Sequence, residues 1–149
     1  FSRFGWLHPG ERLADALKDL KATDGCLSLW EIDPTRSNLL DVVVACASNR
    51  DSIQNVDYIL LERGSVSSFG ELCLEPGKTP FAEANQWHVN LVQLTARRLG
   101  ELCQTAAIVA RERVFGKEVK ALLAERIKDK RILLQSLNKK LAKEFESVG

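Results

Sequence analysis

The feature that most constrains the fold is a helical period in the apolar residues between Asn85 and Val148. Up to Phe115, apolar residues recur at alternating spacings of three and four, and a second apolar stripe starts after Gly116. Such spacing places apolar side chains on one face of a helix. The pattern predicts two long amphipathic helices that are separated at Gly116, a residue type that often ends a helix in the left-handed conformation.

The second predicted helix has an interruption in its apolar stripe. No apolar residue continues the stripe near Lys130 and Arg131, and Ile132 falls on the charged side. An unbroken helix over residues 117–146 would be about 45 Å long, which exceeds the width of a compact domain of this size. We therefore expect either a break near Asp129 or an outward-facing Ile132 that contacts a partner.

The preceding part of the chain predicts a small antiparallel sheet and one helix. Residues 10–22 follow Pro9 and carry one apolar stripe, which predicts a helix. Apolar runs bounded by turn residues predict strands at 26–32, 39–47, 56–62 and 72–74, with a Ser- and Gly-rich loop at 64–70. If the first two strands form a hairpin, Trp30 faces Asp41 across it.

These patterns predict a single α+β domain over residues 1–149, with an α/β part at 1–80 and a helical part at 81–149. Its expected content is a sheet of three or four antiparallel strands, an N-terminal helix and two long C-terminal helices. A chain of 149 residues with 45% apolar and 28% charged side chains has the size and composition of one globular domain. Because the chain begins at Phe1 and has no Met, we expect it to be a piece of a longer protein.

Apolar runs and cysteine spacing indicate a soluble cytoplasmic protein without a membrane partner or a cofactor. The longest apolar run, Val42 to Ala47, is far shorter than the ~20 residues needed to span a bilayer. The four cysteines contain no CxxC spacing, so we expect reduced thiols and no metal site. The predicted hairpin would allow one disulfide, between Cys26 and Cys46.

Motifs for catalysis are weak. Gly77-Lys78-Thr79 looks like the end of a phosphate-binding loop, but that motif requires a glycine where Leu72 stands, so a turn is favoured. His8 and His88 are the only histidines, and general acid–base chemistry usually needs a histidine held by a second group. An enzyme with residues converging around His88 remains an alternative to the favoured non-catalytic protein.

Charge is distributed unevenly along the chain. Residues 1–110 hold 10 basic and 14 acidic side chains, whereas residues 111–149 hold 11 and 6. A basic tail is typical of proteins that contact phosphates or an acidic partner. Acidic residues interleave with the basic ones, and no aromatic between Lys117 and Lys143 would stack on a base. Nucleic-acid binding is therefore the second hypothesis, with phosphate contacts expected at Lys120, Lys128, Lys130, Arg131, Lys139 and Lys140.

The favoured function is non-catalytic protein–protein interaction through the C-terminal helices, as in an immunity, adaptor or regulatory protein. The partner is another protein or a second copy of the chain. In a homodimer, the second helix would pair with its symmetry mate and bury its leucines. The partner-binding residues expected from the sequence are Trp30, Asp41, Ile132, Leu134, Leu137 and Leu141.

Overall fold

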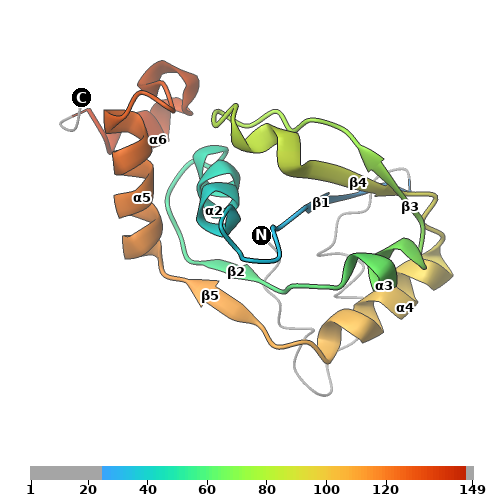
Figure 1. The fold of residues 1–149 in the computed structure, drawn as a ribbon. Helices are drawn as coiled ribbons and strands as arrows, with labels where there is room; N and C mark the ends of the chain where they lie inside the picture. The colour runs from blue at the N-terminus through green and yellow to red at the C-terminus, as the bar shows by residue number, and fades with distance from the viewer. Residues whose placement is uncertain (1–24, 147–149) are drawn as a thin grey trace. The chain divides into compact units, whose positions relative to one another are not determined.

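The computed structural model describes residues 25–146 and shows a mixed α+β fold (Figure 1), as the sequence predicts. In chain order its elements are β1 (Leu27–Trp30), α2 (Leu39–Ser48), β2 (Val56–Tyr58), α3 (Arg63–Ser67), β3 (Glu71–Leu74), the 3-10 helix η2 (Ala84–Trp87), β4 (His88–Val92), α4 (Ala96–Ala107), β5 (Glu112–Val114), α5 (Gly116–Lys128), the 3-10 helix η3 (Leu134–Ser136) and α6 (Lys139–Lys143). The helix predicted at residues 10–22 lies outside the described residues.

The described strands form a three-stranded sheet in the order β1-β4-β3 and a two-stranded sheet of β2 and β5. β3 runs antiparallel to β4, with Cys73 opposite Asn90 and Leu74 opposite Val89. The predictions of strands at 26–32 and 72–74 are confirmed, and β3 is the edge strand expected there. The strand predicted at 56–62 exists but ends at Tyr58.

Two compact units divide the chain, and each takes segments from both the 1–80 and the 81–149 parts. Unit 1 comprises the described residues up to Leu29 together with Asp57–Leu74 and Val89–Glu112, and unit 2 comprises Trp30–Val56, Glu75–His88 and the described residues from Arg113 onward. Each unit has an apolar cluster of its own.

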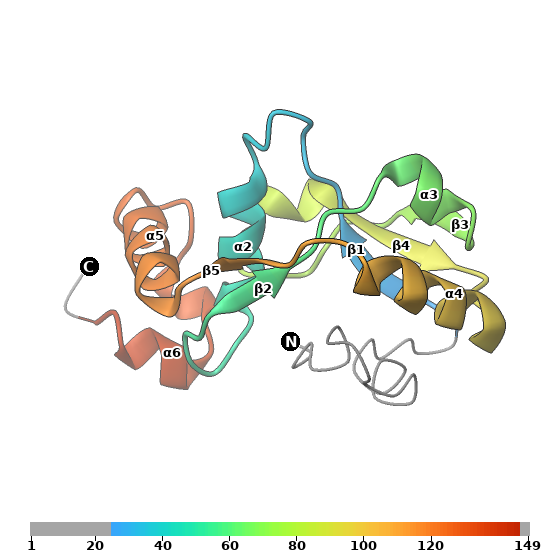
Figure 2. The same ribbon diagram turned by 90° about the horizontal axis from the view of Figure 1, so that it is seen from below.

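In unit 1, α4 packs its apolar stripe against one face of the strands (Figure 2). Leu27 of β1 and Leu91 of β4 point to the same side of the sheet and meet Leu99 and Leu102 of α4. The alternation of side chains along a strand explains why these two positions face the helix.

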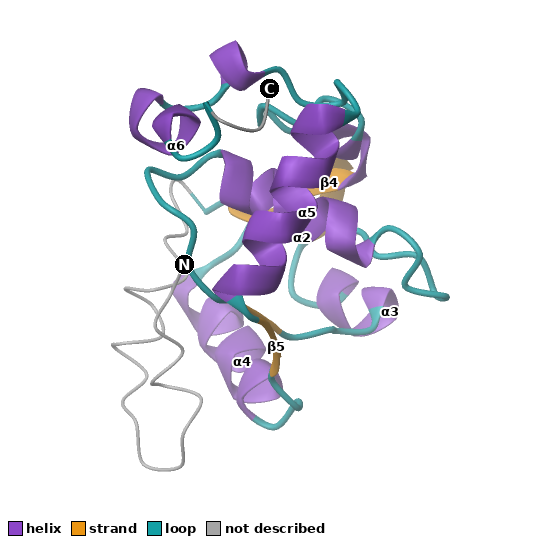
Figure 3. Ribbon diagram, turned by 90° about the vertical axis from the view of Figure 1, so that its left-hand side faces the viewer, coloured by secondary structure: helices purple, strands orange, loops and turns teal. Residues whose placement is uncertain are grey.

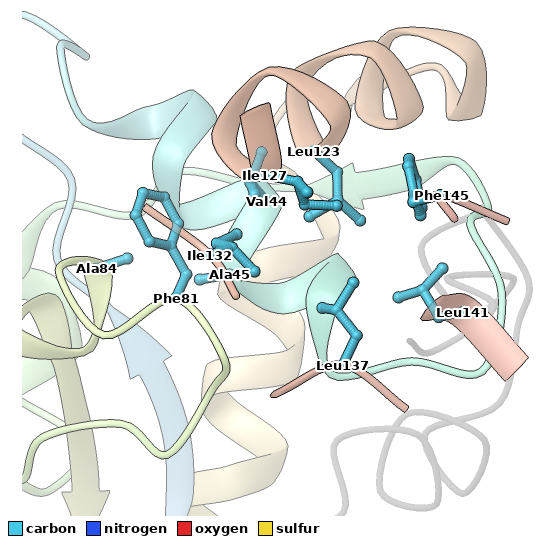
Figure 4. Packing of buried hydrophobic residues seen from close by; sticks show 10 residues of the cluster. All are labelled: Val44, Ala45, Phe81, Ala84, Leu123, Ile127, Ile132, Leu137, Leu141 and Phe145. Atoms are coloured by element: carbon cyan, nitrogen blue, oxygen red, sulfur yellow. The ribbon is translucent and has the colours of Figure 1, made fainter. Parts of the chain in front are cut away.

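In unit 2, α2 packs against α5 (Figure 3). Val44 of α2 and Leu123 of α5 are completely buried, and Phe145, just after α6, closes the same cluster (Figure 4). Burial of large apolar side chains from three helical segments supplies the main stabilisation of this unit.

The strand predicted at 39–47 is wrong, because this segment forms the helix α2. Val42, Val43 and Val44 favour a strand by propensity, but they are buried within a helix instead. A helix buried on most sides has no polar face and hence no visible helical period. The predicted hairpin is wrong with it, and Asp41 does not face Trp30 across two strands.

The long helix predicted up to Phe115 is also shorter than expected. Residues 84–92 form η2 and β4, and only the period from Thr95 onward belongs to α4. Gln93 has a positive φ of 60° and separates β4 from α4. Gly116 begins α5 rather than ending a helix, and a Cβ there would lie 3.2 Å from the Gln54 carbonyl carbon.

Two further predictions, a loop at residues 64–70 and a break near Asp129, have different outcomes. Residues 64–70 were expected to form a loop, but the structure has the short helix α3 at Arg63–Ser67. The break expected near Asp129 is confirmed, because α5 ends at Lys128. α4 and α5 are thus the two main helices of the C-terminal half, each shorter than the sequence period suggests.

Candidate functional site

The end of α5 is held by an ionic cluster in unit 2. Asp41 of α2 accepts from Arg126 of α5 at 2.9 Å and from Arg131 at 3.1 Å. The Asp41 and Arg126 side chains are each only 16% exposed. Asp41, expected from the sequence to contact a partner, therefore links α2 to α5 within its own unit.

Arg131 connects this cluster to the segment that precedes η2. Its guanidinium donates to Glu83 and lies over the Phe81 ring, 4.9 Å from the ring centroid. The hydrogen bond to Glu83 raises the pKa of Arg131 above its ordinary value, so the residue is a permanent cation. Arg131 thereby fixes the chain just after α5 against two other segments of unit 2.

We call residues 128–133 the α5 turn. Within it, Lys130 has a left-handed φ of 58°. The N–H groups of Arg131 and Ile132 both donate to the Arg126 carbonyl, at 2.9 and 3.1 Å. These two bonds give the Arg126 carbonyl hydrogen-bond partners, which the last carbonyls of a helix otherwise lack. Beyond this point the chain turns, so the next side chains point in a different direction from those of the helix.

The reversal buries Ile132 and exposes Leu133. Ile132 is 1% exposed and lies inside the apolar cluster of unit 2, whereas Leu133 is 54% exposed. The expectation of an outward-facing Ile132 is wrong, because it extended the helical period past residue 128, where the helix ends. The exposed apolar residue is the next one along, and the gap in the stripe at Lys130 was the sequence signal for this change of direction.

The other residues expected to bind a partner are mostly part of the same core. Leu137 and Leu141 are buried in the cluster of unit 2, and Leu134 is half-buried against it. Trp30 is half-buried and meets the His88 ring edge-to-face, with the ring centroids 5.2 Å apart. In this conformation the stripe of leucines packs inside unit 2 rather than on its surface.

Three of the six basic residues that were expected to contact phosphate form ion pairs with acidic side chains in the structure. Lys120 pairs with Glu144 at 3.0 Å and Lys140 with Asp51 at 3.5 Å, and Arg131 belongs to the ionic cluster. Lys128, Lys130 and Lys139 are exposed. The basic tail is thus partly neutralised within the fold.

His88 is oriented by a backbone carbonyl. Its Nδ1 lies 2.6 Å from the Glu75 carbonyl oxygen, and since a carbonyl can only accept, Nδ1 carries the proton. This bond fixes the orientation of the ring and leaves Nε2 as its other polar atom. The Asn85 side chain accepts from the Thr79 N–H at 3.0 Å and holds this segment in place. The second group that holds His88 is thus a backbone carbonyl and not a carboxylate.

Residues 25–146 hold all four cysteines and one of the two histidines of the chain. No group of three or more His, Cys, Asp or Glu side chains there is arranged to hold a metal ion. The four cysteines are free, and burial raises the pKa of the Cys46 thiol to about 11. None of the helices in that range has both the length and the apolar character needed to cross a bilayer.

Comparison with models of known protein families, with curated proteins and with solved structures found no match.

Proposed function

We propose that this chain is a non-catalytic protein that binds another protein, as an adaptor, immunity or regulatory protein does, through the C-terminal segment of unit 2. The observation that carries the proposal is the 54% exposed Leu133 on the α5 turn, directly after the buried Ile132. The contact residue thus differs from those expected from the sequence, while the region is the same.

The rigidity of the α5 turn supports this proposal. Arg131 is bonded to Asp41 and Glu83 and stacked on Phe81, so the residue two positions before Leu133 is held from several sides. A contact residue that is fixed before binding loses little conformational entropy when a partner arrives. A single exposed leucine is common on protein surfaces, but one on a clamped turn is suited to act as an anchor.

Affinity purification of the full chain tests the proposal. Leu133→Ala should release a partner that the wild type retains, because the variant removes the apolar contact. Phe115→Ala is the matched control: Phe115 is 62% exposed at the other end of α5 in the same unit, and its loss should leave the partner bound. Thermal unfolding of both variants checks that the fold is intact. Equal retention by Leu133→Ala and wild type would contradict the proposal.

Self-association is the version of this proposal in which the partner is a second copy. Light scattering over a range of concentrations separates the two versions, because only a homodimer changes mass with concentration. Nucleic-acid binding has less support, since Lys120, Arg131 and Lys140 already have acidic partners. We place the protein in the cytoplasm, where reducing conditions keep thiols such as Cys26 and Cys73 free.

A further inference from the structure

We infer that the α5 turn binds an acidic polypeptide segment that carries an apolar side chain, a partner class that rests on the proposed function above. The apolar side chain would contact Leu133, and the carboxylates would contact Lys128 and Lys130. All three residues are exposed and lie within six consecutive positions of unit 2.

The charges on the turn support this choice of partner. Arg131 is already matched by Asp41 and Glu83, so it adds little to the field outside the protein. What remains exposed is Lys128 and Lys130 against the single carboxylate of Asp129. Complementary charge steers association and selects partners more than it adds affinity, while the apolar contact supplies the stabilisation.

The stability of the helix end explains why a lysine is favourable at position 128, but it does not explain a lysine at position 130. A cation at the end of a helix offsets the partial negative charge of the last carbonyls, which explains Lys128. Lys130 follows the helix in the left-handed conformation, where glycine is favoured and a side chain is unfavourable. A lysine at this position is therefore better explained by what its ammonium group contacts than by the stability of the turn.

Binding of labelled peptides to the full chain, followed by fluorescence anisotropy, tests the inference. The probes are a synthetic peptide of alternating Glu and Leu, its Gln-for-Glu counterpart, and single-stranded oligo(dT). The acidic peptide should bind most tightly and weaken as salt is added. Leu133→Ala should weaken it about tenfold, as removal of an apolar anchor does, and the double variant K128Q/K130Q roughly three- to tenfold. Lys117→Gln, an exposed lysine at the start of α5, should change nothing.

The outcomes separate the partner class from the proposed function. Equal binding of the Gln peptide, with the same loss in Leu133→Ala, overturns the acidic partner and leaves protein binding standing. Failure of every peptide, together with a dimer that Leu133→Ala dissociates, overturns it in favour of a second copy. Tighter binding of oligo(dT), or an equal loss in Lys117→Gln, overturns both the partner class and the assigned surface. A Leu133→Ala variant that keeps full affinity for the acidic peptide contradicts the proposed function as well.

Discussion

α4 and α5 are similar in length, and each buries an apolar stripe in its own unit, but their ends are held differently. α4 is capped by the residue just before it, since Thr95 Oγ1 accepts from the Arg98 N–H at 3.2 Å. α5 depends on residues far away in sequence: Asn55 accepts from the Gly116 N–H at 2.8 Å, and Asp41 binds the other end. The start of α4 is thus visible in its own sequence, whereas the contacts that hold α5 appear only in the structure.

The largest expected loss of stability is the same for both helices. Leu102→Ala in α4 and Leu123→Ala in α5 each remove a buried side chain and should each lower the free energy of unfolding by about 2–5 kcal/mol. Urea unfolding measures the loss, and hydrogen exchange locates it in one helix or the other. If one variant lost almost nothing, its unit would not pack as the structure shows.

The next prediction separates the helices by their ion pairs. Asp41→Ala leaves two arginines of unit 2 without their common partner and should cost about 1–3 kcal/mol, between the values for exposed and buried pairs. Glu101→Ala in α4 removes an exposed pair with Arg97 and should cost about 0.3 kcal/mol. Urea unfolding of the two variants checks the difference. Similar losses would show that the cluster at the end of α5 is no stronger than a surface pair.

Removal of the cap at the start of either helix should lower the free energy of unfolding by a smaller amount, which is the same for both helices. Thr95→Ala and Asn55→Ala each remove an acceptor from the first turn of a helix, and each should cost about 1 kcal/mol. Hydrogen exchange should show the loss at the start of α4 for the first variant and at the start of α5 for the second. A loss confined to the loop around Asn55 would mean that α5 needs no cap from a distant residue.

This difference also explains how far the sequence could predict the fold. The period after Gly116 and its gap near Lys130 predict α5 and its break correctly, because one face of that helix is exposed. α2 is hidden in the sequence, since its burial removes the period and its valines suggest a strand. The gap signals that the helix ends, but it does not identify Leu133 as the exposed residue, because Lys130 is not a residue type that signals a left-handed turn.

A small gain in stability is also the most informative about function. Lys130→Gly relieves a left-handed φ of 58° and should raise the free energy of unfolding by about 0.5–1 kcal/mol. Lys130→Ala keeps a Cβ at the same φ, so it should bring no gain. Both variants lose the ammonium group and should bind the acidic peptide more weakly, by a similar factor.

Together the two Lys130 variants, followed by urea unfolding and peptide anisotropy, separate the backbone from the charge. A gain in stability with a loss of binding would show that lysine is kept at the α5 turn at the expense of stability. A loss of stability in Lys130→Gly would contradict this view, because the lysine side chain would then stabilise the turn itself. In that case the end of α5 would be held by its own neighbouring residues, as the start of α4 is, and the contrast between the two helices would be confined to Asn55 and Asp41.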